Sequence, residues 1–371
     1  MARTVSRIEP RGHRRVVAVG AVASAVIVVA VLLSVLFEAR DHPQQPAAAP
    51  FPPSQAVPVT VDRLQRLVGD GAIGWPLAVP YGGPRDVAVT ASAVWITEQN
   101  KGAVDAFADG KLIRYEVDAK FPNSGAFALA PGPSGSVWFT GYPNGNIGRL
   151  LPDGTVNSFS PIVDTGGTIA AAQDLDGSMW ITDVNLGVVI RIDQQGQVAA
   201  YSVPPPAGGR QLVGPYDLAA TPDGTIWFTD PRTRSVGEIT DPDGTPSIVE
   251  RPVQDGTGPR SIATGPDGSV WVTLPKEGIG RIDPAGSVQT IPVRSGRDVV
   301  NNLAIARDGT IWLTTTGRSI LHVRPNGELL QRVLMPGAAV GADGIAIGRD
   351  GTVWAAATDA NMLIEIPHRG T

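Results

Sequence analysis

The chain has 371 residues and a formal net charge of −5, and residues 41–371 hold 24 basic and 33 acidic side chains. Because nucleic-acid binding needs a basic face, this balance argues against a nucleic-acid partner. The absence of cysteine excludes disulfides and thiol nucleophiles, while 44 glycines and 33 prolines favour an all-β protein with many short strands and turns.

The first 37 residues predict a membrane anchor. A basic segment at residues 1–15 with five arginines precedes an uncharged apolar run at residues 16–37. About 20 such residues span a bilayer. The arginine-rich flank is expected to stay in the cytoplasm, which places the rest of the chain outside the cell. The alternative is a cleaved signal peptide, although its apolar core usually has only about 7–15 residues.

Residues 38–70 predict a linker between this anchor and a folded domain. The stretch "DHPQQPAAAPFPPSQAVPV" is rich in proline and alanine and has no periodicity, which is typical of an extended, semi-rigid spacer. It leads into residues 60–68, "TVDRLQRLV", where we expect one short helix capped by Thr60.

A repeat fills residues 71–371. Seven similar phrases, such as "YDLAATPDGTIWFT" and "RSIATGPDGSVWVT", each contain a tryptophan at the same place, at positions 95, 138, 180, 227, 271, 312 and 354. Each unit predicts an apolar strand, a turn, a strand beginning at the tryptophan, and then two further strands. Four antiparallel strands every 40–45 residues or so indicate a propeller blade, so we predict a seven-bladed β-propeller. The tryptophans are interpreted as packing between blades.

Two further features follow from the repeat. The Asp-Gly pairs, such as Asp223-Gly224, predict two-residue hairpin turns. The last unit ends after three strands at "LIEIP", whereas "GAIGWPLAVP" at residues 71–80 precedes the first unit. We therefore expect this N-terminal strand to complete the last blade and close the ring, which leaves no long exposed sheet edge there.

The blade phrases resemble those of the streptogramin lyase (virginiamycin B lyase) family of seven-bladed propellers, over residues 71–367. This resemblance implies an enzyme that opens a cyclic depsipeptide ester by elimination. It also implies a magnesium ion, two histidines where the first strands of successive blades begin, and a glutamate three residues after a tryptophan. Here none of those strand starts is a histidine; His13 and His42 precede the repeats, His322 lies on a predicted third strand, and His368 follows the last strand.

The variable positions of the repeat predict the functional site. The first strand of each blade lines the channel of a propeller, so its start and the end of the second strand are expected at one mouth of that channel. We define a first rim position, where the first strand starts, a second rim position after it, and an acid position three residues after the tryptophan. The candidate ligand-binding residues at these positions are Arg85, Asp86, Glu98, Asp183, Tyr216, Asp217, Asp230, Arg260, Asn301, Asn302 and Asp343.

One pair within this set has several interpretations. A two-residue turn at Asp223-Gly224 places Asp217 opposite Asp230. Two adjacent carboxylates share a proton, bind a cation, or are neutralised by an arginine such as Arg232 or Arg234. The carboxylates and amides of the mouth are also the oxygen ligands found in lactonase-type propellers, which makes Mg²⁺ or Ca²⁺ the candidate cofactor.

Two functions remain open from the sequence. One is a membrane-anchored extracytoplasmic propeller that binds a small-molecule or protein ligand at the channel mouth. The other is a metal-dependent enzyme of the lyase or lactonase type. The missing histidine pair favours the binding function. The acids, amides and arginines at the mouth are nevertheless compatible with an enzyme.

Overall fold

The structure is a computed structural model that describes residues 53–56, 58–61, 64–69, 71–77, 82–117, 125–143, 145–159, 166–205, 213–240, 246–253, 258–283, 286–337 and 339–368. The expected membrane anchor at residues 16–37 lies outside these ranges. Within them, no helix has the length and apolar character needed to cross a membrane. The helical element found there is a short 3-10 turn, η1 (Pro133–Gly135).

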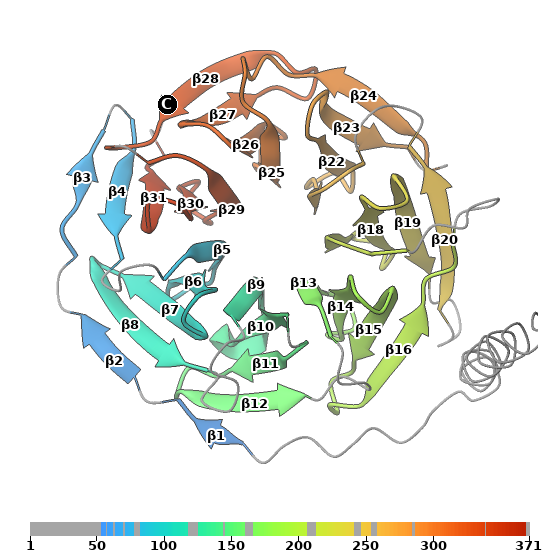
Figure 1. The fold of residues 1–371 in the computed structure, drawn as a ribbon, viewed down its shortest axis with the longest axis horizontal. Coiled ribbons are helices and arrows are strands. Elements are labelled where there is room, and N and C mark those ends of the chain that lie inside the picture. The colour runs from blue at the N-terminus through green and yellow to red at the C-terminus, as the bar shows by residue number, and fades with distance from the viewer. Residues whose placement is uncertain are drawn as a thin grey trace, which may run out of the picture. The chain divides into compact units, whose positions relative to one another are not determined.

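Seven antiparallel sheets of the described residues form a closed ring, which confirms the predicted seven-bladed propeller (Figure 1). The innermost strands of successive blades contact one another around the ring. From the centre outward, blade 1 has β5 (Pro84–Val89), β6 (Val94–Glu98), β7 (Ala103–Ala108) and β8 (Lys111–Glu116); blade 2 has β9 (Gly125–Pro131), β10 (Val137–Tyr142), β11 (Ile147–Leu150) and β12 (Thr155–Phe159); blade 3 has β13 (Thr168–Gln173), β14 (Met179–Asp183), β15 (Val188–Ile192) and β16 (Val198–Ser202).

The remaining blades follow the same order. Blade 4 has β17 (Leu218–Ala220), β18 (Ile226–Asp230), β19 (Ser235–Thr240) and β20 (Ser247–Pro252); blade 5 has β21 (Ile262–Thr264), β22 (Val270–Leu274), β23 (Gly278–Ile282) and β24 (Val288–Pro292); blade 6 has β25 (Val300–Ile305), β26 (Ile311–Thr315), β27 (Ser319–Val323) and β28 (Leu329–Leu334); blade 7 has β29 (Ala342–Ile347), β30 (Val353–Ala357), β31 (Met362–Ile366) and β4 (Ile73–Pro76).

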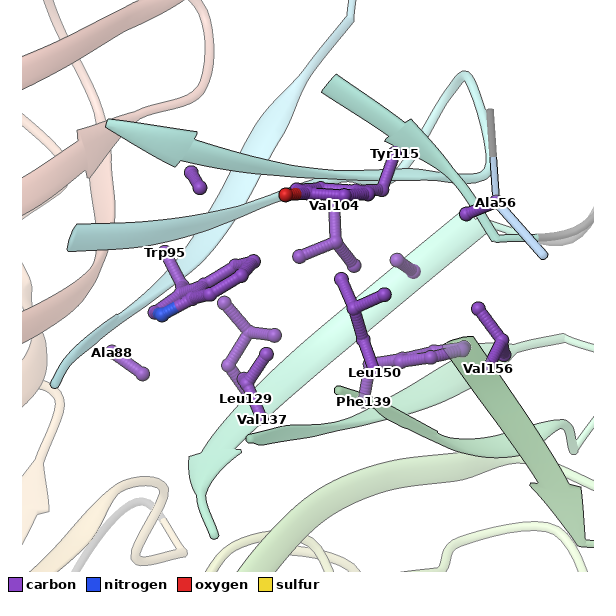
Figure 2. Packing of buried hydrophobic residues seen from close by; sticks show 12 residues of the cluster. Ala56, Ala88, Trp95, Val104, Tyr115, Leu129, Val137, Phe139, Leu150 and Val156 are labelled. Carbon is purple, nitrogen blue, oxygen red and sulfur yellow. The ribbon is translucent and has the colours of Figure 1, made fainter. Parts of the chain in front are cut away.

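The tryptophans of the repeat pack between neighbouring blades, as expected. Trp95 of blade 1 lies in one buried cluster with Leu129 and Phe139 of blade 2, which Figure 2 shows. Trp227 of blade 4 likewise packs with Ile262 of blade 5. Because each tryptophan buries a large apolar surface against the next blade, these contacts contribute much of the free energy that holds the ring together.

The Asp109-Gly110 turn of blade 1 confirms the predicted two-residue hairpin turn, with φ values of 52° and 76° between the paired Ala108 and Lys111, whereas the Asp-Gly turn after the first strand of blade 4 differs from the prediction. In blade 4 the loop has three residues, because the Thr221 N–H bonds to the Thr225 carbonyl and the Gly224 N–H bonds to the Thr221 carbonyl. Only Gly224 takes a positive φ, of 87°, and the Asp223 Oδ1 accepts from the Thr225 N–H at 3.1 Å. Residues 222–224 therefore form a three-residue loop that ends on a left-handed glycine. The expected loop was a two-residue turn in which both residues have a positive φ.

A threonine two residues after the tryptophan joins each of several blades to the next. The Thr229 hydroxyl accepts from the Asp217 N–H at 3.2 Å within blade 4 and donates to the Arg260 carbonyl of blade 5 at 2.6 Å. Thr97, Thr273 and Thr314 bridge their blades to the next in the same way. Blade 7 has Ala356 at this position, and there the Thr358 hydroxyl contacts the Pro84 carbonyl of blade 1 at 2.6 Å.

The predicted ring closure is confirmed. Strand β4, from the N-terminal side of the repeats, pairs antiparallel with β31 and completes blade 7. The Trp75 Nε1 donates to the Glu365 Oε2 at 2.8 Å, and the Trp75 ring contacts the Phe107 ring of blade 1 at a centroid distance of 5.0 Å. The last four residues of the expected strand, 77–80, lie beyond β4, and of these only Leu77 is described.

The described part of residues 53–69 is wrapped around the ring, which corrects the predicted helix. Three short strands add a fifth, outermost strand to three blades: β1 (Ser54–Gln55) to blade 2, β2 (Pro58–Val61) to blade 1 and β3 (Leu67–Val68) to blade 7. Thr60 lies in β2 opposite Ile113, and not at a helix N-terminus. A helix of nine residues is marginal alone, and pairing with open blade edges stabilises the strand form instead.

Candidate functional site

The central channel is a cavity of about 530 Å³ lined by the innermost strands of all seven blades. Every second rim position lines it; these residues are Asp86, Ala128, Ala170, Asp217, Ser261, Asn302 and Gly344. At the first rim position, Arg85, Phe127, Ile169 and Tyr216 also line the cavity. The volume is in the range of small-molecule sites, about 300–1,000 Å³.

Three first rim residues meet at one atom of this mouth. Arg85 of blade 1 and Arg260 of blade 5 each donate a guanidinium N–H to the Tyr216 hydroxyl of blade 4, and both distances are 3.3 Å. The Arg85 guanidinium also lies over the Phe127 ring of blade 2, 4.5 Å from its centroid. The sequence predicted these positions at the mouth but gave no sign that they touch.

A polar network fixes Arg85 from the other side. Its guanidinium pairs with the Asp343 Oδ2 of blade 7 at 2.8 Å. The Asn301 Nδ2 donates to the Asp343 Oδ1 at 2.6 Å, and the Thr358 hydroxyl contacts the Asp343 Oδ2 at 2.8 Å. Asn301 is buried, and Asp343 is only partly exposed. These two predicted site residues therefore hold Arg85 in position at the mouth.

Asp86 and Asp217 occupy the same position in blades 1 and 4 and make matching contacts. In each, Oδ1 accepts from the next N–H of its own strand, and Oδ2 accepts from an N–H of the following blade, at 2.9 Å for Leu129 and 3.0 Å for Ile262. Burial raises the pKa of Asp86 to about 7 and that of Asp217 to about 6, against the lowering effect of these hydrogen bonds. The charge of Asp217 adds to the rise in the pKa of Asp86.

The acid positions are not at the mouth, which corrects the prediction. Asp183 and Asp230 are fully buried and hold the chain after the second strand. The Asp230 Oδ1 accepts from the N–H groups of Arg232 and Thr233, and its Oδ2 accepts from the Gly214 N–H. Asp183 makes the corresponding three bonds in blade 3. These carboxylates are structural, because their oxygens already accept backbone donors.

The predicted pair of Asp217 with Asp230 does not form. Leu218 is paired with Phe228, so the three-residue loop shifts the register by one and the Thr229 N–H bonds to the Asp217 carbonyl. The Asp217 side chain lines the channel, whereas the Asp230 side chain is buried beside the loop. None of the three interpretations of this pair, a shared proton, a bound cation or an ion pair with arginine, is therefore supported.

Glu98 and Glu250 are buried acids of a different kind. Neither Glu98 oxygen has a hydrogen-bond partner among the described residues, although Oε1 lies 3.5 Å from the Arg114 guanidinium. Burial, with a smaller effect of the Asp105 charge, raises the pKa of Glu98 to about 8. Burial, followed by the charge of Asp230, also raises the pKa of Glu250 to about 8. The sequence analysis missed Glu250, because it lies on a fourth strand where the repeat has no fixed pattern.

The mouth does not fit the magnesium site that the sequence resemblance implies. Arg85 stands at the first rim position of the blade that carries Glu98, and its cation is paired with Asp343. Glu98 is covered by the backbone of Gly82, where an added Cβ would overlap the Glu98 Oε2. Among the residues that the structure describes, no group of three or more histidines and acids is arranged to hold a metal ion. His322 stacks on Trp312 on the third strand of blade 6, away from the mouth as predicted.

Comparisons with known proteins agree with the fold. The model of the virginiamycin B lyase family matches residues 74–366. A solved structure of virginiamycin B lyase from Staphylococcus aureus is 21% identical, with a TM-score of 0.72, covering 80% of this chain and 99% of that one. A catalytically inactive variant of that enzyme with quinupristin gives 21% identity and a TM-score of 0.71 over 80% of this chain and 99% of that one.

A more distant likeness is to a gluconolactonase from Xanthomonas campestris, at 18% identity and a TM-score of 0.51, covering 83% of this chain and 99% of that one. A search of curated protein sequences found no match. At these identities the structural likenesses establish the propeller fold alone.

Proposed function

This chain belongs to the virginiamycin B lyase family, and from that premise we propose that its propeller binds a small-molecule or protein ligand at the channel mouth. The observation that carries the proposal is the meeting of Arg85, Tyr216 and Arg260, from three blades, over a cavity of about 530 Å³. Convergent polar groups at one end of a concave site are what orient a bound ligand. The polar groups here come from the variable positions of the repeat.

The alternative is a lyase or lactonase-type enzyme, which family membership favours. The residues present do not supply the histidine pair and accessible glutamate that such a lyase would use. A Ser-His-Asp triad has no support either, because His322 is stacked on Trp312 and hydrogen-bonded to the Thr310 hydroxyl at 2.7 Å. The proposal is therefore binding without ring opening.

Quinupristin, the compound held by the inactive relative, separates the two functions. The protein is incubated with quinupristin and Mg²⁺, and the product is analysed by mass spectrometry. We expect the cyclic form to persist, whereas ring opening that depends on added Mg²⁺ and stops with EDTA would establish the enzyme. Thermal melting with EDTA, Mg²⁺ and Ca²⁺ gives a second measurement, in which we expect an unchanged midpoint.

Mouth binding itself is tested by a thermal-shift screen of small molecules and peptides against the wild type and a Tyr216→Ala variant. A ligand of the mouth raises the midpoint of the wild type and loses this effect in the variant. An Arg307→Met variant, altered at an exposed turn at the other end of the inner strands, serves as the matched control. Shifts that survive in Tyr216→Ala would place binding elsewhere.

We further propose that residues 16–37 anchor the propeller to the cell membrane and display it on the outer side. The support is the uncharged apolar run behind the arginine-rich segment at residues 1–15. In fractionated cells, the full chain should stay with membranes after a high-salt wash and be digested by protease added to intact spheroplasts. A chain that begins at residue 38, fused to a cleavable export signal, should be released.

A further inference from the structure

The mouth has one cationic and one apolar side. Around the first rim position, blades 2 and 3 carry Phe127 and Ile169, whereas blades 4 and 5 carry Tyr216 and Arg260. Phe127, Ile169 and Tyr216 line the cavity itself. Arg85 connects the two sides, since its guanidinium contacts both the Phe127 ring and the Tyr216 hydroxyl.

The two arginines differ in how their charge is balanced. The Arg85 guanidinium is paired with Asp343 at 2.8 Å. Among the described residues, no acid forms an ion pair with Arg260, and its guanidinium donates to the Tyr216 hydroxyl. Arg260 therefore has N–H groups left for a ligand, in the planar arrangement that suits a carboxylate or phosphate.

Tyr216 offers a further donor at the same place. Within the described residues, its hydroxyl is contacted by the guanidinium N–H groups of Arg85 and Arg260, so the phenolic oxygen is the acceptor in both contacts. The hydroxyl hydrogen is used in neither contact. A ligand oxygen near this point would receive the Tyr216 hydroxyl and the Arg260 guanidinium together.

Resting on the mouth-binding function proposed above, we propose that the ligand carries an oxyanion, a carboxylate or a phosphate, joined to an apolar or aromatic group. The oxyanion binds to Arg260 and Tyr216. The apolar group lies against Phe127 and Ile169. A purely polar anion would leave the apolar wall unused. A neutral apolar molecule would leave the remaining N–H groups of Arg260 unused, since the Asp217 charge attracts Arg260 but forms no ion pair with it among the described residues.

The test uses three aromatic probes that differ in charge: benzoate, phenyl phosphate and the neutral benzamide. Each is titrated at constant ionic strength, and the dissociation constant is obtained by ligand-observed NMR. We expect saturable binding of benzoate or phenyl phosphate, and the tighter of the two identifies the oxyanion. Benzamide should bind about tenfold more weakly or worse, corresponding to one lost charge-assisted hydrogen bond.

The variants assign the binding to the mouth. Arg260→Met should weaken oxyanion binding about tenfold, and Arg260→Lys, which keeps the charge but not the fork, should weaken it less. Phe127→Ala should weaken all three probes, whereas the distant Arg307→Met should bind like the wild type. Near-UV circular dichroism shows whether each variant keeps the wild-type packing, and Arg260→Lys carries the test where Arg260→Met does not fold.

Three outcomes would overturn the inference: no saturable binding of either anion, equal binding of benzamide, or undiminished anion binding in both Arg260 variants. If benzamide binds as tightly as the anions and this binding is lost in Phe127→Ala, only the proposed need for an oxyanion is overturned, because a ligand would still occupy the mouth. If the ligands found in the thermal-shift screen stabilise Tyr216→Ala as much as the wild type, the proposed binding at the mouth is itself overturned.

Discussion

The guanidinium of Arg85 lies 3.3 Å from the hydroxyl of Tyr216, although the two residues belong to blades 1 and 4 and are 131 positions apart in the chain. The contact crosses the mouth and connects blades that are not neighbours in the ring. It therefore links the residues of the proposed ligand site to the stability of the propeller.

This contact predicts a measurable coupling. Tyr216→Phe removes the acceptor of two guanidinium donors and should lower the free energy of unfolding by about 0.5–1.5 kcal/mol. A double-mutant cycle with Arg85→Met, followed by urea denaturation, isolates the pair. Tyr142→Phe is the matched control and should change stability by less than about 0.5 kcal/mol, since Tyr142 is 41% exposed. Additive effects of the two mouth substitutions would show that the contact contributes nothing.

The threonine bridges predict a second effect. Thr229→Val leaves the part-buried Asp217 N–H and Arg260 carbonyl without this partner and should cost about 1–3 kcal/mol. Thr229→Ser keeps the hydroxyl and should recover most of the loss. Chemical denaturation measures both variants. Equal stability of the valine and serine variants would exclude the bridge as the cause.

Ring closure predicts how the starting residue affects folding. A chain that begins at residue 82 lacks β4, including the contact of Trp75 with Glu365, and exposes the edge of β31. We expect it to melt at a lower temperature and less cooperatively than a chain that begins at residue 53. A chain that begins at residue 71 loses only β1, β2 and β3 and should fall between them. Calorimetry distinguishes the three, and equal melting of the chains from 53 and 82 would refute closure by β4.

Glu98 predicts a dependence of stability on pH. Its pKa is about 8 in the folded protein against 4.5 for the free side chain, so the folded state holds the proton more tightly. Stability should be greatest below pH 4.5 and decline as pH rises towards 8, by at most about 1.4 kcal/mol per pH unit for this group. Glu98→Gln should remove this share of the slope, and so be more stable than the wild type above pH 8.

Urea denaturation between pH 5 and pH 9 measures the slope. Glu328→Gln is the matched control, because the Glu328 side chain is 53% exposed, and it should leave the slope unchanged. Parallel curves for the wild type and Glu98→Gln would contradict the assignment. Glu250, Asp86 and Asp217 also have raised pKa values, so some decline should remain in the variant.

The fold was readable from the sequence because its determinants recur. Tryptophan, glycine turns and alternating apolar residues at a fixed period describe one blade, and seven copies describe the ring. The register was less accessible. A single extra residue in the Asp-Gly loop of blade 4, which ends on the left-handed Gly224, moves the strand partners by one position, so that Asp217 lies opposite Thr229 and not Asp230.

The candidate site was predicted in part for the same reason. The repeat placed Asp86, Tyr216 and Asp217 at the beginnings of the inner strands, and in the structure all three line the channel. It could not show that Asp183 and Asp230 serve the loops behind their strands, because that depends on backbone donors with no signature in the side-chain pattern. The prediction of a helix at residues 60–68 was wrong because the described part of this segment pairs with the outer edges of blades 1 and 7. These edges are distant in the sequence, and local helix propensity carries no information about them.

Strand β4 also affects the order in which the protein can fold during synthesis. Ile73 pairs with Glu365, so one edge of blade 7 is made early by the ribosome and the rest of it almost last. Until β31 emerges, β4 can pair with β3 but not with the rest of blade 7, and pairings of such long sequence separation form slowly. The nascent chain must therefore keep an open ring through most of its synthesis, and the finished ring is a product of the complete chain.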